Sequence, residues 1–330
     1  MPGVIGLDIG GVNTKAVWRD GDARRAALRF YDVVREHEAL TAVVRDVVGE
    51  LHDGPVELVA LTMTAELSDE FRTRREGVAF VLDAVEAAAA APVLALTTAG
   101  ELVSLAEARA RPLDVAAANW VASAHAVGAR YPDALMLDVG STTTDVIPIS
   151  GGRVAAAGRT DLDRLLAGEL VYTGALRTNL AAIAARVPVR GRWCPVASEL
   201  FAISGDVHLI LRHIAAEAYT CPTPDGRPAS VECARERVAR LVCADSEQLA
   251  PDEIDAIAAH VHAEQVRQVE AAARRAADGA GPVVPLGVGA FLAREVAARL
   301  RRPVAEMDWS AEERDAAPAA ALAELAACSC

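Results

Sequence analysis

The alternation of hydrophobic and polar positions predicts three strands at the start of the chain. Residues 3–8, 14–20 and 25–33 are short apolar or alternating runs, separated by turn residues. Residues 36–51 have helical spacing instead, and one face carries Leu40, Val43, Val44, Val47 and Val48. Further elements are predicted as a strand at 57–63, a helix at 75–90, a strand at 92–96 and a helix at 112–131.

The same order of elements begins again after residue 130. Strands are predicted at 135–138, 145–150 and 153–158, the last two joined by a two-residue turn at Gly151-Gly152. Residues 162–185 have mostly helical periodicity. The remaining elements are a helix at 251–278, a strand at 283–286, a glycine turn at 287–289, and helices at 290–300 and 311–327.

This repeated order predicts an α/β protein with two similar halves. We expect a first domain at residues 1–130, a second at 131–310, and a C-terminal helix and tail at 311–330. Residues 188–245 interrupt the second half, because periodicity is poor there and Pro, Gly, Cys and Trp are frequent. We therefore expect this segment to form a cap inserted in the second domain.

The clearest internal similarity relates the turn that follows the first strand of each half. Residues 7–15 and 137–145 share four positions: Leu7 and Leu137, Asp8 and Asp138, Gly10 and Gly140, and Thr14 and Thr144. At the end of the repeat, Lys15 stands opposite Asp145. Lys15 is the single lysine among 33 basic residues, the others being arginines. A lone ammonium group in a glycine-rich loop indicates a specific role.

Each repeat places an aspartate before a turn of small residues, a pattern typical of phosphate-binding loops. Glycines let backbone N–H groups approach an anion closely. Since an aspartate cannot bind phosphate directly, we expect Asp8 and Asp138 to hold Mg²⁺. A single such loop would be explained equally well by a tight hairpin, but two in matching positions favour phosphate. The predicted phosphate-binding residues are Gly10, Gly11, Asn13, Thr14, Lys15, Gly140, Ser141, Thr142, Thr143, Gly287 and Gly289.

The composition argues against several classes of partner. The net charge of −13 disfavours nucleic acid and anionic membrane surfaces. Residues 85–96 are too short and alanine-rich to span a bilayer, and the N-terminus lacks the basic region of a signal peptide. Six cysteines without a regular framework are typical of reduced thiols. We expect a soluble cytoplasmic protein that acts on small molecules, and a homo-oligomer stays open.

These motifs resemble a known superfamily. The two Asp-x-Gly turns and the glycine turn at 287–289 resemble the phosphate loops of the actin, sugar kinase and Hsp70 superfamily. Gly10-Gly11 and residues 160–178 are similar to its hydantoinase/oxoprolinase branch, although Lys15 replaces the acid usual in hydantoinases. Closer resemblance, to tetrahydromethanopterin-linked C1-transfer pathway proteins and methanofuran synthases, rests on residues 6–15, 61–67, 118–122, 205–208, 219–226 and 242–245.

The resemblance implies two ribonuclease H-like lobes around a central cleft, with a small insertion in the second. It also implies an activity in methanofuran or methylofuran synthesis. An aminomethylfuran-methyl diphosphate would condense with the phenol of a glutamylated tyramine or tyrosine, releasing diphosphate. Mg²⁺ and Lys15 would stabilise the leaving group. Glu66 is our first candidate for the base that takes the phenol proton, and Asp145 is the second.

Other polar residues are weaker candidates. Asp206 and His208 could contact substrate, although a core histidine is the plainer interpretation of His208. Arg159, Arg164 and Arg177 are candidates for a glutamate carboxylate by location. A zinc site assembled from Cys221, Cys233, Cys243, His208 and His213 has unusual spacing, so buried thiols are favoured. His260 and His262, two positions apart on a predicted helix, are expected at the surface.

Two other functions stay open from the sequence. The chain could be an ATP-dependent kinase or ATP-driven amidohydrolase, since these are common chemistries of the resembled fold. It could also be a nucleotide-binding regulator without turnover. Either would require an adenine site beside Gly287 and Phe291, whereas side chains filling that space would favour a diphosphate substrate and make ATP unnecessary.

Overall fold

The computed structural model describes residues 3–51, 55–276 and 281–328, which form two compact units. The first unit contains Met1–Met136, Ile147–Ala167 and Glu306–Cys330, and the second contains Leu137–Val146 and Gly168–Ala305. This division differs from the predicted boundaries at residues 130 and 310. The C-terminal residues belong to the first unit because their last helix packs on its sheet.

The first unit is built on one sheet with strand order β3-β2-β1-β4-β5-β6. The strands are β1 (Gly3–Ile9), β2 (Asn13–Asp20), β3 (Ala23–Phe30), β4 (Val56–Met63), β5 (Val93–Leu96) and β6 (Leu102–Ser104). The helices are α1 (Val33–Glu36), α2 (Leu40–Leu51), α3 (Arg74–Ala88), α4 (Leu105–Ala110), α5 (Asn119–Arg130), α6 (Asp161–Ala167), α12 (Ala311–Asp315) and α13 (Ala317–Ala327). Short 3-10 turns are η1 (His37–Ala39), η2 (Ala65–Leu67) and η3 (Pro112–Asp114).

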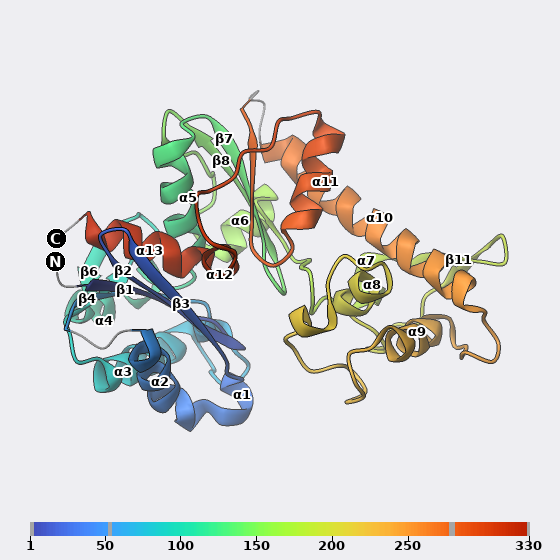
Figure 1. Ribbon diagram of the computed structural model, residues 1–330, viewed down its shortest axis with the longest axis horizontal. Coiled ribbons are helices and arrows are strands. Elements are labelled where there is room, and N and C mark those ends of the chain that lie inside the picture. Colours follow the sequence, from blue (N-terminus) through green and yellow to red (C-terminus); the bar gives the residue numbers. More distant parts are fainter. Residues whose placement is uncertain (1–2, 52–54, 277–280, 329–330) are drawn as a thin grey trace. The chain divides into compact units, whose positions relative to one another are not determined.

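Alternation along β1 determines what each face of this sheet contacts. Ile5, Leu7 and Ile9 belong to the core shared with α2 and α3. Gly6 faces the other way, where a Cβ atom would lie 2.0 Å from the carbonyl oxygen of Ala319 in α13. Figure 1 shows α13 on one side of the sheet and α2 with α3 on the other. Asp8, two residues after Gly6, therefore lies on the α13 face.

A second sheet has strand order β10-β8-β7-β13, with β9 beside β8. Its strands are β7 (Ala134–Val139), β8 (Thr144–Ser150), β9 (Arg153–Val154), β10 (Leu170–Val171) and β13 (Val283–Leu286). A separate hairpin pairs β11 (Arg186–Val189) with β12 (Arg192–Pro195). The helices of the second unit are α7 (Leu180–Ile183), α8 (Ser204–Ile210), α9 (Val231–Ala239), α10 (Pro251–Ala276) and α11 (Ala290–Leu300), with 3-10 turns η4 (Ala216–Ala218) and η5 (Arg240–Val242).

The segment predicted as a cap has its own core. Apolar residues of β11, α8, α9 and the first half of α10 form one buried cluster, and α10 also packs against α11. Figure 1 shows α8 and α9 beside α10. Among the residues that the structure describes, no helix combines the length and apolarity needed to cross a membrane.

The repeated strand–turn–strand order is confirmed. Gly10 N–H donates to the carbonyl of Asn13 at 2.8 Å, and Gly140 N–H donates to that of Thr143 at 2.9 Å. The same bond therefore closes both turns. The predicted hairpin at Gly151-Gly152 is also confirmed, since both glycines have positive φ, as a type I′ turn requires.

Two helical predictions were wrong. Residues 112–131 are the turn η3 followed by α5 from Asn119, and the preceding β6 and α4 were missed. Ser104 starts α4 through a capping box with Glu107. Residues 162–185 contain only the short helices α6 and α7, because Gly168 ends α6 at φ +77° and the chain then joins β8.

Three smaller predictions also need correction. The strand predicted at 153–158 is only Arg153–Val154, and the helix predicted at 311–327 is divided into α12 and α13 at Ala316. Cys330 and the predicted end of α10 at residues 277–278 lie outside the described residues.

Candidate active site

The first candidate loop connects β1 to β2 at the end of the first sheet. β1 ends with Asp8 and Ile9, and Asp8 pairs across the strands with Lys15. Gly10 permits a tight turn, since a Cβ atom there would lie 2.8 Å from the carbonyl oxygen of Asn13. Directly paired residues share a face of a sheet, so Asp8 and Lys15 both lie on the α13 face.

Asp8 is a buried carboxyl group beside an ammonium group. Only 7% of Asp8 is exposed, and burial raises its pKa to about 6, although the charge of Lys15 lowers it. The Lys15 ammonium donates to the carbonyl oxygen of Asp315 at the end of α12, at 2.8 Å. The C-terminal segment thus holds Lys15 near Asp8.

Glu66 lies in η2, just beyond the end of β4. It is 1% exposed, and neither carboxylate oxygen has a hydrogen-bond partner. Burial raises the pKa of Glu66 to about 7, while Arg74 lowers it and Asp161 and Asp8 raise it further. A carboxyl group that titrates near neutrality suits a general acid or base.

The end of this sheet gathers buried polar atoms that lack hydrogen-bond partners. Buried polar groups are normally bonded, so such a concentration in one place indicates a site that binds a ligand. All of these atoms are oxygens, the donor type that Mg²⁺ prefers. They are Asp8 Oδ1, Asn13 Oδ1, Thr62 Oγ1, and Glu66 Oε1 and Oε2.

The second candidate loop connects β7 to β8 and lies against the late glycine turn. Gly287 has φ +76°, and a Cβ atom there would lie 2.5 Å from both Asp138 Oδ1 and the carbonyl oxygen of Val139. Gly289 N–H donates to the same carbonyl at 2.8 Å. The glycine turn and Asp138, 149 positions apart in the sequence, are therefore adjacent.

Residues 173–178 form the wall behind this second loop. Ala175 N–H donates to the carbonyl of Gly140, and Leu176 and Arg177 N–H both donate to that of Ser141. These backbone bonds explain why the segment is not helical. The Arg177 guanidinium contacts Thr142 Oγ1 at 3.4 Å, which places it beside the loop.

The other predicted residues of the loops have different surroundings. Asp145 is 7% exposed and its backbone pairs with Leu170 of β10. Arg159 is exposed and belongs to the first unit, whereas Arg177 belongs to the second. The structure therefore places Arg177 beside the second candidate loop.

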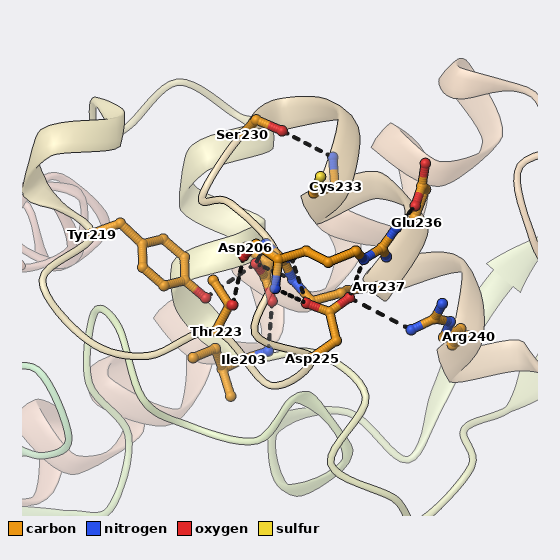
Figure 2. A network of polar contacts seen from close by, with 11 residues as sticks. Ile203, Asp206, Tyr219, Thr223, Asp225, Ser230, Cys233, Glu236, Arg237 and Arg240 are labelled. Atoms are coloured by element: carbon orange, nitrogen blue, oxygen red, sulfur yellow. Dashed lines mark hydrogen bonds and ion pairs between the residues drawn. The ribbon is translucent and has the colours of Figure 1, made fainter.

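Asp206 occupies the interior of the second unit and contacts protein groups (Figure 2). Its carboxylate accepts from Arg237 at 2.7 and 2.9 Å and from Tyr219 Oη at 3.1 Å. Asp206 and Arg237 are both 0% exposed. The predicted substrate contact by Asp206 is therefore inconsistent with this structure, in which the ion pair joins α8 to α9.

His208 is also fully buried, and burial lowers its pKa to about 3. The plainer prediction of a core histidine is thus confirmed over substrate contact. The expectation that His262 lies at the surface was wrong, since only 12% of its side chain is exposed. The prediction that these thiols are buried was also wrong. Cys221 and Cys233 are partly exposed, and Cys243 is exposed.

With the two loops in place, the comparison with known proteins becomes informative. The sequence matches the hydantoinase/oxoprolinase family over residues 57–328, which is more than half of the chain. The chain belongs to the hydantoinase/oxoprolinase family.

Two relatives of this family member have the same name, (4-{4-[2-(gamma-L-glutamylamino)ethyl]phenoxymethyl}furan-2-yl)methanamine synthase. The protein from Methanocaldococcus jannaschii is 39% identical over 252 residues, covering 76% of this chain and 74% of that protein. The protein from Methanococcus vannielii is 43% identical over 119 residues, covering 36% of this chain and 53% of that protein. Both are named as synthases, so this family member is an enzyme.

Solved structures agree on the fold. Nucleotide-free acetone carboxylase has a TM-score of 0.57 and 11% identity, covering 97% of this chain and 70% of that chain. A glucokinase from Streptomyces griseus has a TM-score of 0.52 and 15% identity, covering 98% of each chain. At these identities the likeness shows the fold, which is that of the actin and sugar kinase superfamily.

The structure of this family member adds contacts that the sequence did not predict. Arg74 bonds Asp161 at 2.5 Å, and both influence the pKa of Glu66. Arg164, 2% exposed, stacks on Trp120 with its guanidinium carbon 4.5 Å from the ring centroid. The signal for Trp120 was present, since it lies in the quoted motif at 118–122. Arg74 had no local signal.

Proposed function

We propose that this enzyme condenses an (aminomethylfuranyl)methyl diphosphate with the phenol of a glutamylated tyramine or tyrosine. Diphosphate leaves, and the product belongs to methanofuran or methylofuran synthesis. The proposal is supported by the 39% identity to a synthase named for such a phenoxymethyl furan, over three quarters of both chains. The enzyme class would be a transferase that forms a C–O bond.

The buried carboxyl group of Glu66 is the observation that carries the proposal. A phenol has a pKa near ~10, so it needs a base to become a good nucleophile near neutrality. Glu66 has a pKa of about 7 and no hydrogen-bond partner for either carboxylate oxygen. In the proposed reaction Glu66 takes the phenol proton as the phenol oxygen bonds to the furan-methyl carbon. The bond from that carbon to the diphosphate oxygen breaks, and its electron pair leaves with diphosphate.

The loops supply groups suited to the departing anion. Asp8 in the first unit and Asp138 in the second are the carboxylates that each unit offers to Mg²⁺. When bound, Mg²⁺ would neutralise charge that develops on the leaving diphosphate. Lys15 adds a fixed positive charge beside Asp8, and Arg177 adds one beside Thr142. These positive groups act against the overall negative charge of the chain.

The surroundings of Phe291 favour diphosphate over a nucleotide. Its ring lies 4.8 Å from that of His208 and 5.1 Å from that of His213, between centroids. Phe291 follows Gly289 by two residues, so aromatic rings lie where the sequence predicted the adenine site that an ATP-dependent enzyme would require. We therefore propose that turnover does not require ATP.

The test is to incubate the protein with the furan-methyl diphosphate, glutamyl-tyramine and Mg²⁺, with and without ATP. The expected result is the coupled ether with equimolar diphosphate in both reactions, lost on chelation and restored by Mg²⁺. ATP consumption without ether would contradict the proposal and favour the kinase or amidohydrolase alternative. Nucleotide binding without any turnover would favour the regulator.

A further inference from the structure

Three histidines of the second unit converge at one point, outside the two loops. His208 lies in α8, His213 follows that helix, and His262 lies in α10. One ligand nitrogen from each can be chosen so that all three lie within 4.8 Å of one another. Their burial is graded, because His208 is buried, His262 is partly exposed and His213 is exposed.

Hydrogen bonds to neighbouring groups fix the tautomer of His208. The Gln265 side-chain amide donates to Thr173 Oγ1 at 2.9 Å and to the carbonyl of Gly174 at 2.8 Å. Its oxygen therefore faces His208 Nε2, at 2.9 Å, and must accept a proton from it. His208 Nδ1 is left with its lone pair directed away from Gln265.

His262 has the same arrangement with a different partner. Its Nε2 lies 2.8 Å from Glu295 Oε2, which can only accept when ionised. His262 Nδ1 is buried and has no hydrogen-bond partner. Metal-binding histidines usually have this arrangement: one ring N–H donates to an oxygen acceptor, and the other nitrogen keeps its lone pair for the metal.

The spacing of the nitrogens suits a small cation. His208 Nδ1 and His213 Nδ1 are 3.3 Å apart. Two nitrogens bound tetrahedrally to zinc at about 2.0–2.1 Å are separated by about 3.3 Å. The exposure of His213 leaves a side from which water could complete the coordination.

We propose that His208, His213 and His262 bind one divalent transition-metal ion, with Zn²⁺ as the best match to three imidazoles. This site is separate from the proposed Mg²⁺ site and does not depend on the proposed reaction. The ion would connect α8 to α10. Gln265 bonds both His208 and residues 173–174, so the ion would also help to hold those two residues. Gly174 lies against the backbone of Thr142 in the second loop. The ion would thereby help to keep residues 173–178 against that loop.

The test uses the full chain after removal of metal with a chelator. Zn²⁺ is titrated against a chromophoric competitor, and Co²⁺ is added separately to record its visible absorption. We expect one equivalent of Zn²⁺ per chain, a Co²⁺ spectrum of nitrogen coordination, and a rise in melting temperature on binding. His213→Ala and His262→Ala should each weaken Zn²⁺ binding at least tenfold.

His260→Ala is the matched control, because His260 is on the same helix and its ring lies 5.1 Å from Trp193. It should bind Zn²⁺ as the unaltered chain does. Equal affinity in all four proteins would overturn the proposal, and so would a thiolate-to-metal charge-transfer band in the Co²⁺ spectrum. Absence of Zn²⁺ binding by the unaltered chain would leave a hydrogen-bonded histidine cluster and would also overturn it. The Co²⁺ spectrum of the unaltered chain does not depend on how the variants fold.

Discussion

Glu66 and Asp8 are carboxyl groups whose burial at one end of the first sheet raises their pKa values. The pKa of Glu66 is about 7, against an ordinary value of 4.5, and that of Asp8 is about 6, against 3.8. A raised pKa in the folded state means that stability is greatest at low pH and falls as pH rises through the folded value. The free energy of unfolding should therefore fall as pH rises from about 4 to about 7, because both carboxyl groups lose their protons more easily in the unfolded chain.

Replacing Glu66 should separate stability from activity. Glu66→Gln removes a buried charge, so at pH 8 we expect the free energy of unfolding to rise by about 1–3 kcal/mol. The rate of ether formation should fall by about 100-fold or more, and its rise with pH through about 7 should disappear. Denaturant unfolding and initial rates from pH 5 to 9 measure both effects. Glu57→Gln, at an exposed position of β4, the strand that precedes η2, is the control, and equal activity in both variants would exclude Glu66 as the base.

Lys15 should matter for catalysis more than for stability. Its ammonium lowers the pKa of Asp8, so in Lys15→Ala that pKa should rise further. The turnover number should fall by about tenfold to 100-fold, since a charge near the leaving group is lost. The free energy of unfolding should change by less than about 1 kcal/mol, because Lys15 is partly exposed. Lys15→Arg keeps the charge and serves as the control, and unchanged turnover in Lys15→Ala would contradict this role.

Asp206 should behave as a structural residue. In Asp206→Asn the buried guanidinium of Arg237 loses its main partner, and we expect a loss of about 3 kcal/mol in the free energy of unfolding. Asp255→Asn breaks a partly exposed pair with Arg235 and should cost less than about 1 kcal/mol. Chemical denaturation and KM for the phenol substrate are the measurements. A raised KM with unchanged stability would restore the predicted substrate contact.

The elements that the sequence predicts well are those with strong local signals. The two strand–turn–strand units follow from period-two alternation and glycine turns, and α2, α3, α10 and α11 follow from helical periodicity. Residues 162–185 were mistaken for a helix because their alanine and leucine content resembles one. Their backbone N–H groups instead bond the carbonyls of Gly140 and Ser141, and such distant bonds leave no periodic pattern.

The glycine turn after β13 offers a test of how closely the second loop is held. In Gly287→Ala the new Cβ atom would collide with Asp138 Oδ1 and the Val139 carbonyl, so Asp138 should move. A displacement of about 1 Å can reduce turnover by about 100-fold. Gly191→Ala has a similar φ, +72°, and no atoms within 4 Å of the new Cβ atom. Both variants carry the strain of a positive φ, but Gly287→Ala should lose more stability in denaturant unfolding because of the collision, and only Gly287→Ala should lose activity. Equal activity would show that the turn does not position Asp138.

Across the whole chain, local motifs identified the loops, but distant segments complete the first one. Lys15 is held by Asp315, 300 positions later, and α13 covers the face of β1 that carries Asp8. Nothing near residue 15 signals the contribution of the C-terminal helices. The orphaned oxygens around Asp8, and the histidines around Gln265, likewise depend on tertiary packing. The sequence therefore predicted the family and the two loops. The burial and charge surroundings of Asp8 and Lys15 could be obtained only from the structure.

The central claim is that the bond between the furan-methyl carbon and the bridging oxygen of the diphosphate breaks. This can be measured by placing a heavy oxygen isotope at that bridging position and analysing the products by mass spectrometry, with ATP absent. The account predicts that all of the label leaves with diphosphate and that the ether carries the unlabelled phenol oxygen. Label retained on the furan product would mean that a P–O bond breaks instead, as in phosphoryl transfer, and would contradict the account.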